Sequence, residues 1–291
     1  MSADPSSAVP ILLIGGYLGA GKTTLINRLL NSELLPANTA VLVNDFGDIN
    51  IDEQLIRGGS KADNVIGLAN GCICCSIADD LSSALEQLRK TSVQRIVLEC
   101  SGVAEPAKAR QQCHYPGFSP QGCVVLVDAT AHDDRCNDKY VGALATTQVQ
   151  QGDLLVVTKS DLNPGFCLPA LQAAVSAQDN GLIEMLLGWQ AQTAEWQPIQ
   201  SRSALSFTAT TWSQTEVVER APLLAYLRQL PKSVQRVKGF VRTPDGLLEV
   251  HRVDTRVAAQ LRLDLSHKPP PLGLVFIGYQ PEDLPQRAPS F

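Results

Sequence analysis

The sequence lacks the features of a membrane protein or a nucleic-acid-binding protein. No stretch approaches the ~18 consecutive apolar residues of a membrane span, and the first residues lack the basic and then apolar segments of a secretory signal. Basic residues are not in excess, since 24 Lys and Arg stand against 29 Asp and Glu. Because binding to phosphates needs a basic face, we expect no nucleic-acid partner. Because a membrane span and a secretory signal are lacking, we expect no membrane partner and a cytoplasmic location.

Histidine is scarce, and internal repeats are absent. None of the four histidines has metal-ligand spacing to another. Cysteine is more frequent, with eight residues. Because the cytosol is reducing, we expect metal-binding, catalytic or buried thiols rather than disulfides. Three cysteines cluster within four residues, and the isolated ones, expected to be ordinary thiols, are Cys100, Cys113, Cys123, Cys136 and Cys167.

The remaining composition is that of a globular chain, with 44% hydrophobic and 18% charged residues. A length of 291 residues exceeds the ~150-residue prior for one domain. Short apolar runs alternate with helical patterns in the first part, which predicts a doubly wound, mostly parallel α/β sheet in residues 1–228. The predicted strands are 11–14, 40–43, 95–98, 124–127 and 153–157, and the predicted helices are 23–30, 78–90 and 169–177.

The character of the chain changes after residue 229. Strand-like segments occupy residues 237–243, 247–253, 260–265 and 273–279. The first two are joined by Thr243-Pro-Asp-Gly246, which is a good turn sequence. These patterns predict a smaller β-rich (α+β) domain in residues 229–291.

The first apolar run is followed by a phosphate-binding motif. Gly16-Tyr-Leu-Gly-Ala-Gly-Lys-Thr23 matches G-x-x-x-x-G-K-[ST] and directly precedes a predicted helix. Glycines let backbone N–H groups turn toward the β-phosphate, the lysine reaches the β- and γ-phosphate oxygens, and the first threonine ligates Mg²⁺. The motif predicts a P-loop NTPase with the nucleotide-binding residues Gly16, Gly19, Gly21, Lys22, Thr23 and Thr24, of which Lys22 is also catalytic.

A P-loop needs an acidic residue on a neighbouring strand beside its Mg²⁺. Glu99 ends the predicted strand 95–98, and Asp128 ends the next predicted strand. We favour Glu99, because it is followed by Gly102, whose N–H could sense the γ-phosphate; Asp128 is the alternative.

Lys159 and Asp161 follow a late strand in the sequence Thr158-Lys-Ser-Asp161. A carboxylate there accepts hydrogen bonds from both N1–H and the amine of guanine, whereas adenine presents an acceptor at N1. The lysine stem would lie on the base. We therefore predict GTP as the nucleotide, with an adenine-using P-loop kinase as a disfavoured alternative that would leave both residues without a role.

Three thiols stand close together at Cys72, Cys74 and Cys75. They precede a predicted helix, whose dipole favours thiolates. Three thiolates suit Zn²⁺ or Cu(I) and leave a fourth tetrahedral position open, which fits metal transfer. A redox pair or buried thiols are the alternatives.

These motifs together resemble the CobW-like metallochaperone GTPases. The resemblance rests on the P-loop, Asn44-Asp-Phe-Gly47, the cysteine triplet, Glu99-Cys-Ser-Gly102 with Glu105-Pro106, and Lys159-x-Asp161, while Lys238-Gly-Phe240 and Leu274-Val-Phe-Ile-Gly278 look like the family's C-terminal domain. It implies a GTPase with Glu in the magnesium-side motif and a cysteine metal site coupled to the nucleotide. It also implies delivery of zinc, or else cobalt, nickel or iron, to a client protein. The family commonly has Glu where this chain has Asp45.

The resulting hypothesis is a GTPase cycle that controls metal release. GTP and Mg²⁺ order the loops around Asp45 and Glu99, and hydrolysis to GDP changes the exposure of the metal. Asp45, Asp48 and Glu105 are the candidates for orienting the attacking water. Because phosphoryl transfer depends on positioning and charge neutralisation, we expect slow turnover without metal or partner. A regulatory GTPase that senses redox state or metal without delivering metal is the alternative, and a second copy of the chain is an open option as partner.

Overall fold

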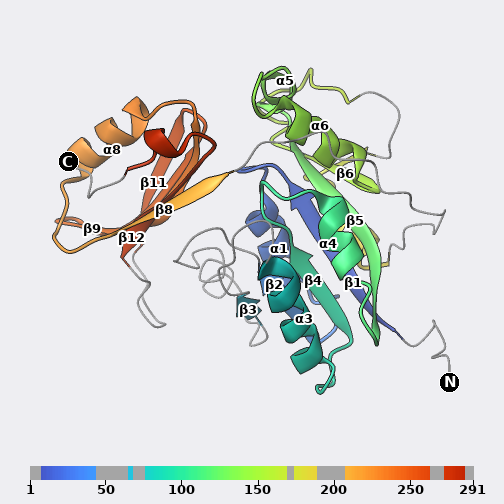
Figure 1. Cartoon of the computed structure of the whole chain (residues 1–291). Coiled ribbons are helices and arrows are strands. Elements are labelled where there is room, and N and C mark those ends of the chain that lie inside the picture. Colours follow the sequence, from blue (N-terminus) through green and yellow to red (C-terminus); the bar gives the residue numbers. More distant parts are fainter. Residues whose placement is uncertain are drawn as a thin grey trace. The chain divides into compact units, whose positions relative to one another are not determined.

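The computed structural model describes residues 8–43, 65–67, 76–168, 174–188, 207–262 and 272–285. They divide into two compact units, with the division near residue 205 (Figure 1). Each unit has its own sheet and its own buried core. In the described part of the chain, no helix combines the length and hydropathy of a membrane span.

The first unit is built on a parallel seven-stranded sheet in the order β3-β2-β4-β1-β5-β6-β7. The strands are β1 (Val9–Gly16), β2 (Thr39–Val43), β3 (Val65–Gly67), β4 (Arg95–Glu99), β5 (Phe118–Asp128), β6 (Leu154–Thr158) and β7 (Ala174–Ser176). β1 lies in the middle, because parallel strands reached by crossovers on both sides place the first strand at the switch point of the sheet. All five predicted strands of this unit are confirmed.

Helices cover both faces of this sheet. They are α1 (Lys22–Leu30), α3 (Ser76–Leu88), α4 (Pro106–Gln112), α5 (His132–Cys136), α6 (Gly142–Gln150) and α7 (Leu182–Gly188). Successive residues of β1 point to opposite faces, so Ile11 and Leu13 join the core beneath α3, while Leu12 joins the core beneath α1 and α7. α3 and α4 lie on the same face (Figure 1). This confirms the doubly wound α/β class.

One predicted helix of this unit is wrong in its last residues. β7 occupies Ala174–Ser176 and pairs in parallel with β6, where the sequence pattern predicted a helix over 169–177. Residues 169–173 lie outside the described part. A short apolar segment has no intrinsic preference strong enough to resist pairing with the open edge of a sheet.

The second unit is an antiparallel five-stranded sheet in the order β11-β10-β9-β12-β8. Its elements are β8 (Thr208–Ser213), α8 (Arg220–Gln229), β9 (Val234–Thr243), β10 (Gly246–Val253), β11 (Arg256–Arg262), β12 (Gly273–Gly278) and the short 3₁₀ helix η2 (Pro281–Asp283). Leu223 and Leu227 of α8 pack against Val237 and Phe276 in its core.

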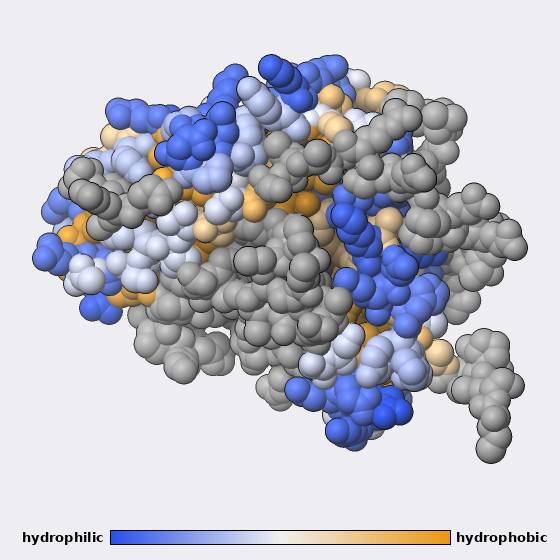
Figure 2. All heavy atoms as spheres, viewed as in Figure 1, coloured by the Kyte–Doolittle hydropathy of each residue, from blue (hydrophilic) through white to orange (hydrophobic). Residues whose placement is uncertain are grey.

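The second unit begins before the boundary predicted at residues 228 and 229. β8 pairs with β12, and α8 supplies core side chains, so both elements belong with the second sheet. The sequence pattern missed them because β8 is rich in threonine and only half-buried, and lacks a clear apolar alternation. On the face that Figure 2 shows, hydrophilic residues cover much of the described surface, as expected when apolar side chains fill the two cores.

Candidate nucleotide-binding site

The loop between β1 and α1 has the backbone of a phosphate-binding loop. Gly16, Gly19 and Gly21 have φ angles of 125°, 75° and 97°, which side chains rarely adopt. A Cβ on Gly16 would also lie 2.5 Å from the carbonyl oxygen of Leu126. No side chain caps Gly21 at the start of α1, and the N-terminus of a helix favours a bound anion. The glycines of the motif therefore allow the backbone conformation that a phosphate-binding loop requires.

The Lys22 side chain folds back onto the P-loop. Its side chain is buried, with 4% of the residue exposed, and its ammonium donates to the carbonyl oxygens of Gly16 (2.9 Å) and Tyr17 (3.3 Å). A buried ammonium beside the N-terminus of α1 gives this loop a positive electrostatic potential. Such a potential suits a polyphosphate.

Thr23 of α1 contacts Glu99 at the end of the neighbouring strand β4. The Thr23 hydroxyl donates to Oε1 of Glu99 at 3.5 Å, and Glu99 is 2% exposed at the end of β4. β4 is adjacent to β1, with Ile14 opposite Glu99, so the sheet register fixes this approach. A hydroxyl and a carboxylate are the oxygen ligands that Mg²⁺ prefers. The geometry favours Glu99 over Asp128 as the partner of Thr23.

Asp128 is instead bonded to Lys159 of the Thr158-Lys-Ser-Asp161 motif. Its side chain is fully buried; Oδ2 accepts from Lys159 Nζ at 2.6 Å, and Oδ1 accepts from the N–H (3.0 Å) and hydroxyl (2.6 Å) of Thr130. Burial raises the pKa of the Asp128 carboxyl, but the hydrogen bonds from Lys159 and Thr130 and the charge of Lys159 outweigh burial and leave this pKa below its usual value. Asp128 is therefore ionised at neutral pH.

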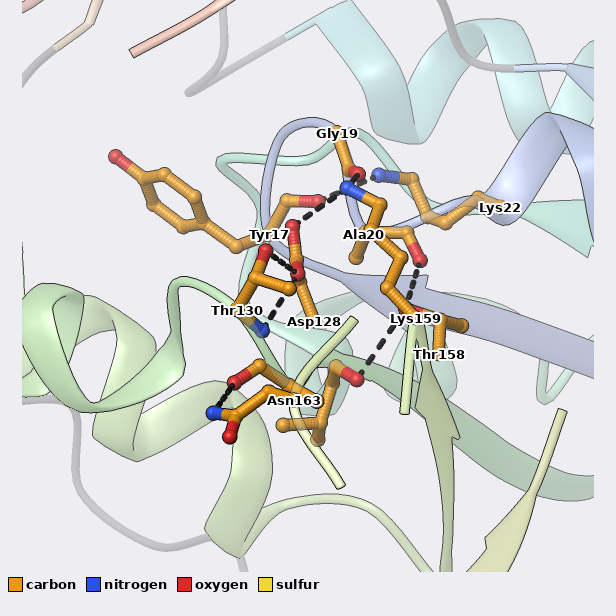
Figure 3. A network of polar contacts seen from close by, with 11 residues as sticks. Tyr17, Gly19, Ala20, Lys22, Asp128, Thr130, Thr158, Lys159 and Asn163 are labelled. Carbon is orange, nitrogen blue, oxygen red and sulfur yellow. Dashed lines mark hydrogen bonds and ion pairs between the residues drawn. The ribbon is translucent and has the colours of Figure 1, made fainter. Parts of the chain in front are cut away.

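The same network reaches the phosphate loop (Figure 3). Lys159 Nζ also donates to the carbonyl oxygen of Gly19 at 3.0 Å, and the Thr158 hydroxyl donates to that of Ala20 at 2.9 Å. Lys159 has a φ of 55°, an uncommon value outside glycine. Residues 158 and 159 therefore join the end of β6 to the P-loop, so that a base and a phosphate bound here would be held by one connected framework.

Asp161 lies on the exposed side of this framework. Its Oδ1 accepts from Gln178 Nε2 at 2.9 Å, and the hydroxyl of Ser160 is 3.5 Å from that of Ser176. Ser176 and Gln178, which β7 brings beside the motif, were not predicted from the sequence. Their only sequence signal was a short serine-ended apolar segment, which the helical interpretation obscured.

Gly102 and Glu105 follow β4 in a buried loop. A Cβ on Gly102 would lie 2.6 Å from Leu18 Cδ2 and 2.9 Å from Leu18 N, so this glycine permits close contact with the P-loop. The Glu105 carboxylate pairs with Lys108 at 3.2 Å. Gln148 of α6, also not predicted from the sequence, donates to the carbonyl oxygens of Gly102 (3.2 Å) and Ala104 (2.8 Å).

Several predicted site residues lie outside the described part of the structure: Asp45, Asp48, Cys72, Cys74 and Cys75. Among the described residues, no group of three or more His, Cys, Asp or Glu side chains could hold a metal ion. The isolated cysteines are free; Cys100, Cys113 and Cys123 are buried, and burial raises the pKa of each thiol.

Comparisons with known proteins agree with this geometry. Residues 10–178 match the model of the CobW/HypB/UreG nucleotide-binding domain, and residues 207–287 match that of the cobalamin synthesis protein cobW C-terminal domain.

Two curated relatives and one solved structure illustrate the similarity. The zinc chaperone YjiA of Escherichia coli is 36% identical over 165 residues, covering 53% of this chain and 50% of that protein. The zinc-regulated GTPase metalloprotein activator 1 of Schizosaccharomyces pombe is 30% identical over 178 residues, covering 57% and 43%. The chain thus spans about half the length of these relatives. The crystal structure of Zn(II)-bound YjiA GTPase from E. coli aligns with a TM-score of 0.45 and 20% identity, covering 95% of this chain and 96% of that one.

The first family model covers more than half of the chain and includes the P-loop, Glu99 and the Lys159 motif. The second covers the antiparallel unit. The chain belongs to the CobW/HypB/UreG family of nucleotide-binding proteins, with a cobW C-terminal domain.

Proposed function

We propose that this protein is a GTP-hydrolysing metallochaperone that binds a thiophilic metal ion, zinc foremost, and delivers it to a client metalloprotein. The main support is one observation: the guanine-type motif at Lys159 is hydrogen-bonded to a P-loop whose glycines leave a positive cradle. The names of the two relatives, a zinc chaperone and a zinc-regulated GTPase, support zinc as the cargo.

Phosphate binding is assigned to the P-loop and α1. Lys22 exchanges the carbonyl oxygens of Gly16 and Tyr17 for the β- and γ-phosphate oxygens, and Thr24 follows Thr23 in the first turn of α1. Thr23 and Glu99 would hold Mg²⁺, which would neutralise phosphate charge when bound.

Base recognition is assigned to Asp161 and Lys159. Asp161 is exposed and releases Gln178 to accept hydrogen bonds from N1–H and the amine of guanine. Lys159 is already fixed by Asp128 and Gly19, so its stem is oriented before the base arrives. Preorganisation of this kind lowers the entropic cost of binding.

Cargo binding is assigned to Cys72, Cys74 and Cys75, and a nucleotide-responsive catalytic role to Asp45. The support is chemical, since three neighbouring thiols form a soft site with an open fourth position. In this mechanism hydrolysis of GTP changes the exposure of that site.

The experiment is a zinc and cobalt titration of the reduced protein, with and without Mg²⁺ and a non-hydrolysable GTP analogue. We expect thiolate-to-cobalt charge-transfer bands that vanish in the Cys72→Ser, Cys74→Ser, Cys75→Ser triple variant, with an affinity that differs between the two nucleotide conditions. Metal binding that ignores the nucleotide would reject the metallochaperone and leave a GTPase alone.

Two controls test the nucleotide site separately. Lys22→Ala should abolish hydrolysis while sparing the fold, and retained turnover would reject the P-loop assignment. Unlabelled ATP should compete poorly with labelled GTP, because adenine leaves Asp161 without a donor at N1.

A further inference from the structure

The loop that follows Glu99 is fixed from two sides. On one side, Gly102 approaches the P-loop so closely that a Cβ would lie within 3.0 Å of the Leu18 N and Cα atoms. On the other, Gln148 Nε2 donates both of its hydrogens, to the carbonyl oxygens of Gly102 (3.2 Å) and Ala104 (2.8 Å). The loop therefore has little freedom to move away from the phosphate cradle.

The Gly102 N–H is the unusual group in this loop. Gly102 is buried, yet no hydrogen bond between described residues is donated by its N–H. A buried amide without an acceptor is rare, because it loses the hydrogen bonds that water would supply. An amide beside Leu18 of the P-loop is well placed for a ligand oxygen that arrives with the nucleotide.

Gln148 is suited to hold the loop that carries this N–H in place, through the carbonyl oxygens of Gly102 and Ala104. Its side chain comes from α6, and the residue is only 1% exposed. Rotation of its amide would leave two carbonyl oxygens without their donor in a water-poor environment. One turn further along, Gln151 Oε1 accepts from Ala107 N at 2.9 Å, which fixes the first turn of α4 rather than Gly102.

We propose that Gln148 is a positioning residue that presets the Gly102 N–H for the γ-phosphate and thereby favours GTP over GDP. This inference rests on the proposed function. Because GDP has no γ-phosphate, an error in the orientation of Gly102 weakens binding of GTP and leaves binding of GDP nearly unchanged. A residue with a purely structural role would affect both nucleotides alike.

The test is Gln148→Met, which keeps the length and approximate volume of the side chain but removes both donors. Affinities of the full chain for fluorescent GDP and for a fluorescent non-hydrolysable GTP analogue are measured with Mg²⁺. We expect the affinity for the GTP analogue to fall about tenfold, the effect of one lost hydrogen bond of ordinary strength, and the affinity for GDP to change less than about twofold.

Two matched variants on the same segment sharpen the comparison. Gln150→Met changes an exposed neighbour, and Gln151→Met removes the contact with Ala107; neither should alter the ratio of the two affinities. Gln148→Asn keeps the amide group, but its side chain is one methylene too short to reach both carbonyl oxygens. It should therefore also lower the ratio of the affinity for the GTP analogue to the affinity for GDP. If Gln148→Met does not fold, the same ratio measured on Gln148→Asn tests the proposal.

The outcomes separate this inference from the proposed function. If the unmodified chain does not bind the GTP analogue, the proposed function is rejected and this inference with it. If the unmodified chain binds both nucleotides and the Gln148 variants leave the ratio unchanged, or lower both affinities equally, only the positioning role is overturned.

Discussion

Removal of the Asp128 carboxylate should destabilise the nucleotide-binding unit and weaken nucleotide binding together. The carboxylate is completely buried and accepts three hydrogen bonds, one from Lys159 and two from Thr130. Asp128→Ala leaves these donors without their acceptor, whereas Asp128→Asn keeps an acceptor for Thr130 and removes the charge.

The magnitude follows from the exposure of the donors. A hydrogen bond to a charged group contributes about 1.5–3 kcal/mol when buried. The Lys159 side chain is 33% exposed, so water partly replaces its lost partner, and we take the lower end of this range. The two bonds from Thr130 add about 1 kcal/mol together, since its hydroxyl can turn to another acceptor. We therefore expect the free energy of unfolding to fall by about 2.5 kcal/mol in Asp128→Ala and by about 1–2 kcal/mol in Asp128→Asn.

Thermal unfolding and nucleotide titration check this estimate. At about 2–4 °C per kcal/mol for a domain of this size, the Tm of Asp128→Ala should fall by about 5–10 °C. Affinity for GDP should fall as well, because Lys159 loses one of the two groups that orient it. The exposed Asp134→Ala is the control. A loss below about 1 kcal/mol with unchanged GDP affinity would refute the reasoning.

Three further predictions test the loop, the second unit and the buried thiols. Gly16→Ala should lower the free energy of unfolding by more than about 3 kcal/mol, because the new Cβ would clash with the Leu126 carbonyl. Gly21→Ala should lower it by only about 1–2 kcal/mol, the cost of the strained φ, because its Cβ would have no neighbour nearer than 3.7 Å. Equal Tm values for the two variants would contradict this prediction. Arg252→Met should lower the stability of the second unit by about 2–4 kcal/mol in urea unfolding. The reason is that the fully buried guanidinium donates to the carbonyl oxygens of Leu230, Pro231 and Val234. A change within about 0.5 kcal/mol would reject a stabilising role for Arg252. Burial raises the pKa of the Cys100 thiol to about 12 in the folded protein, whereas the thiol of the unfolded chain ionises near pH ~8.5. Between these two values only the unfolded chain loses the proton, so the stability of the fold decreases as pH rises from ~8.5 toward 12. Urea unfolding from pH 8 to 11 should show a slope about 1.4 kcal/mol per pH unit shallower in Cys100→Ala than in the parent, and identical slopes would exclude a buried neutral thiol.

Local patterns in the sequence were enough to predict the main elements of the first unit. Apolar runs such as 40–43 are buried on both sides, and the same property that marks them in the sequence makes them central parallel strands. The P-loop was predictable for a similar reason, because its positive φ angles require glycine at fixed positions in a short segment. The choice of Glu99 over Asp128 also came from neighbouring residues, and the contact with Thr23 favours it.

The tertiary structure decided the features that depend on residues far apart in the chain. The partner of Asp128 is Lys159, 31 residues later, and Gln148 reaches Gly102 over 46 residues. β7 became a strand because β6 offered an open edge, and β8 joined the second unit because β12 did. Local sequence patterns indicate which residues can be buried and which positions can adopt the φ angles of a turn. Only the folded chain determines which buried donor meets which acceptor, because that pairing is set by sheet order and register.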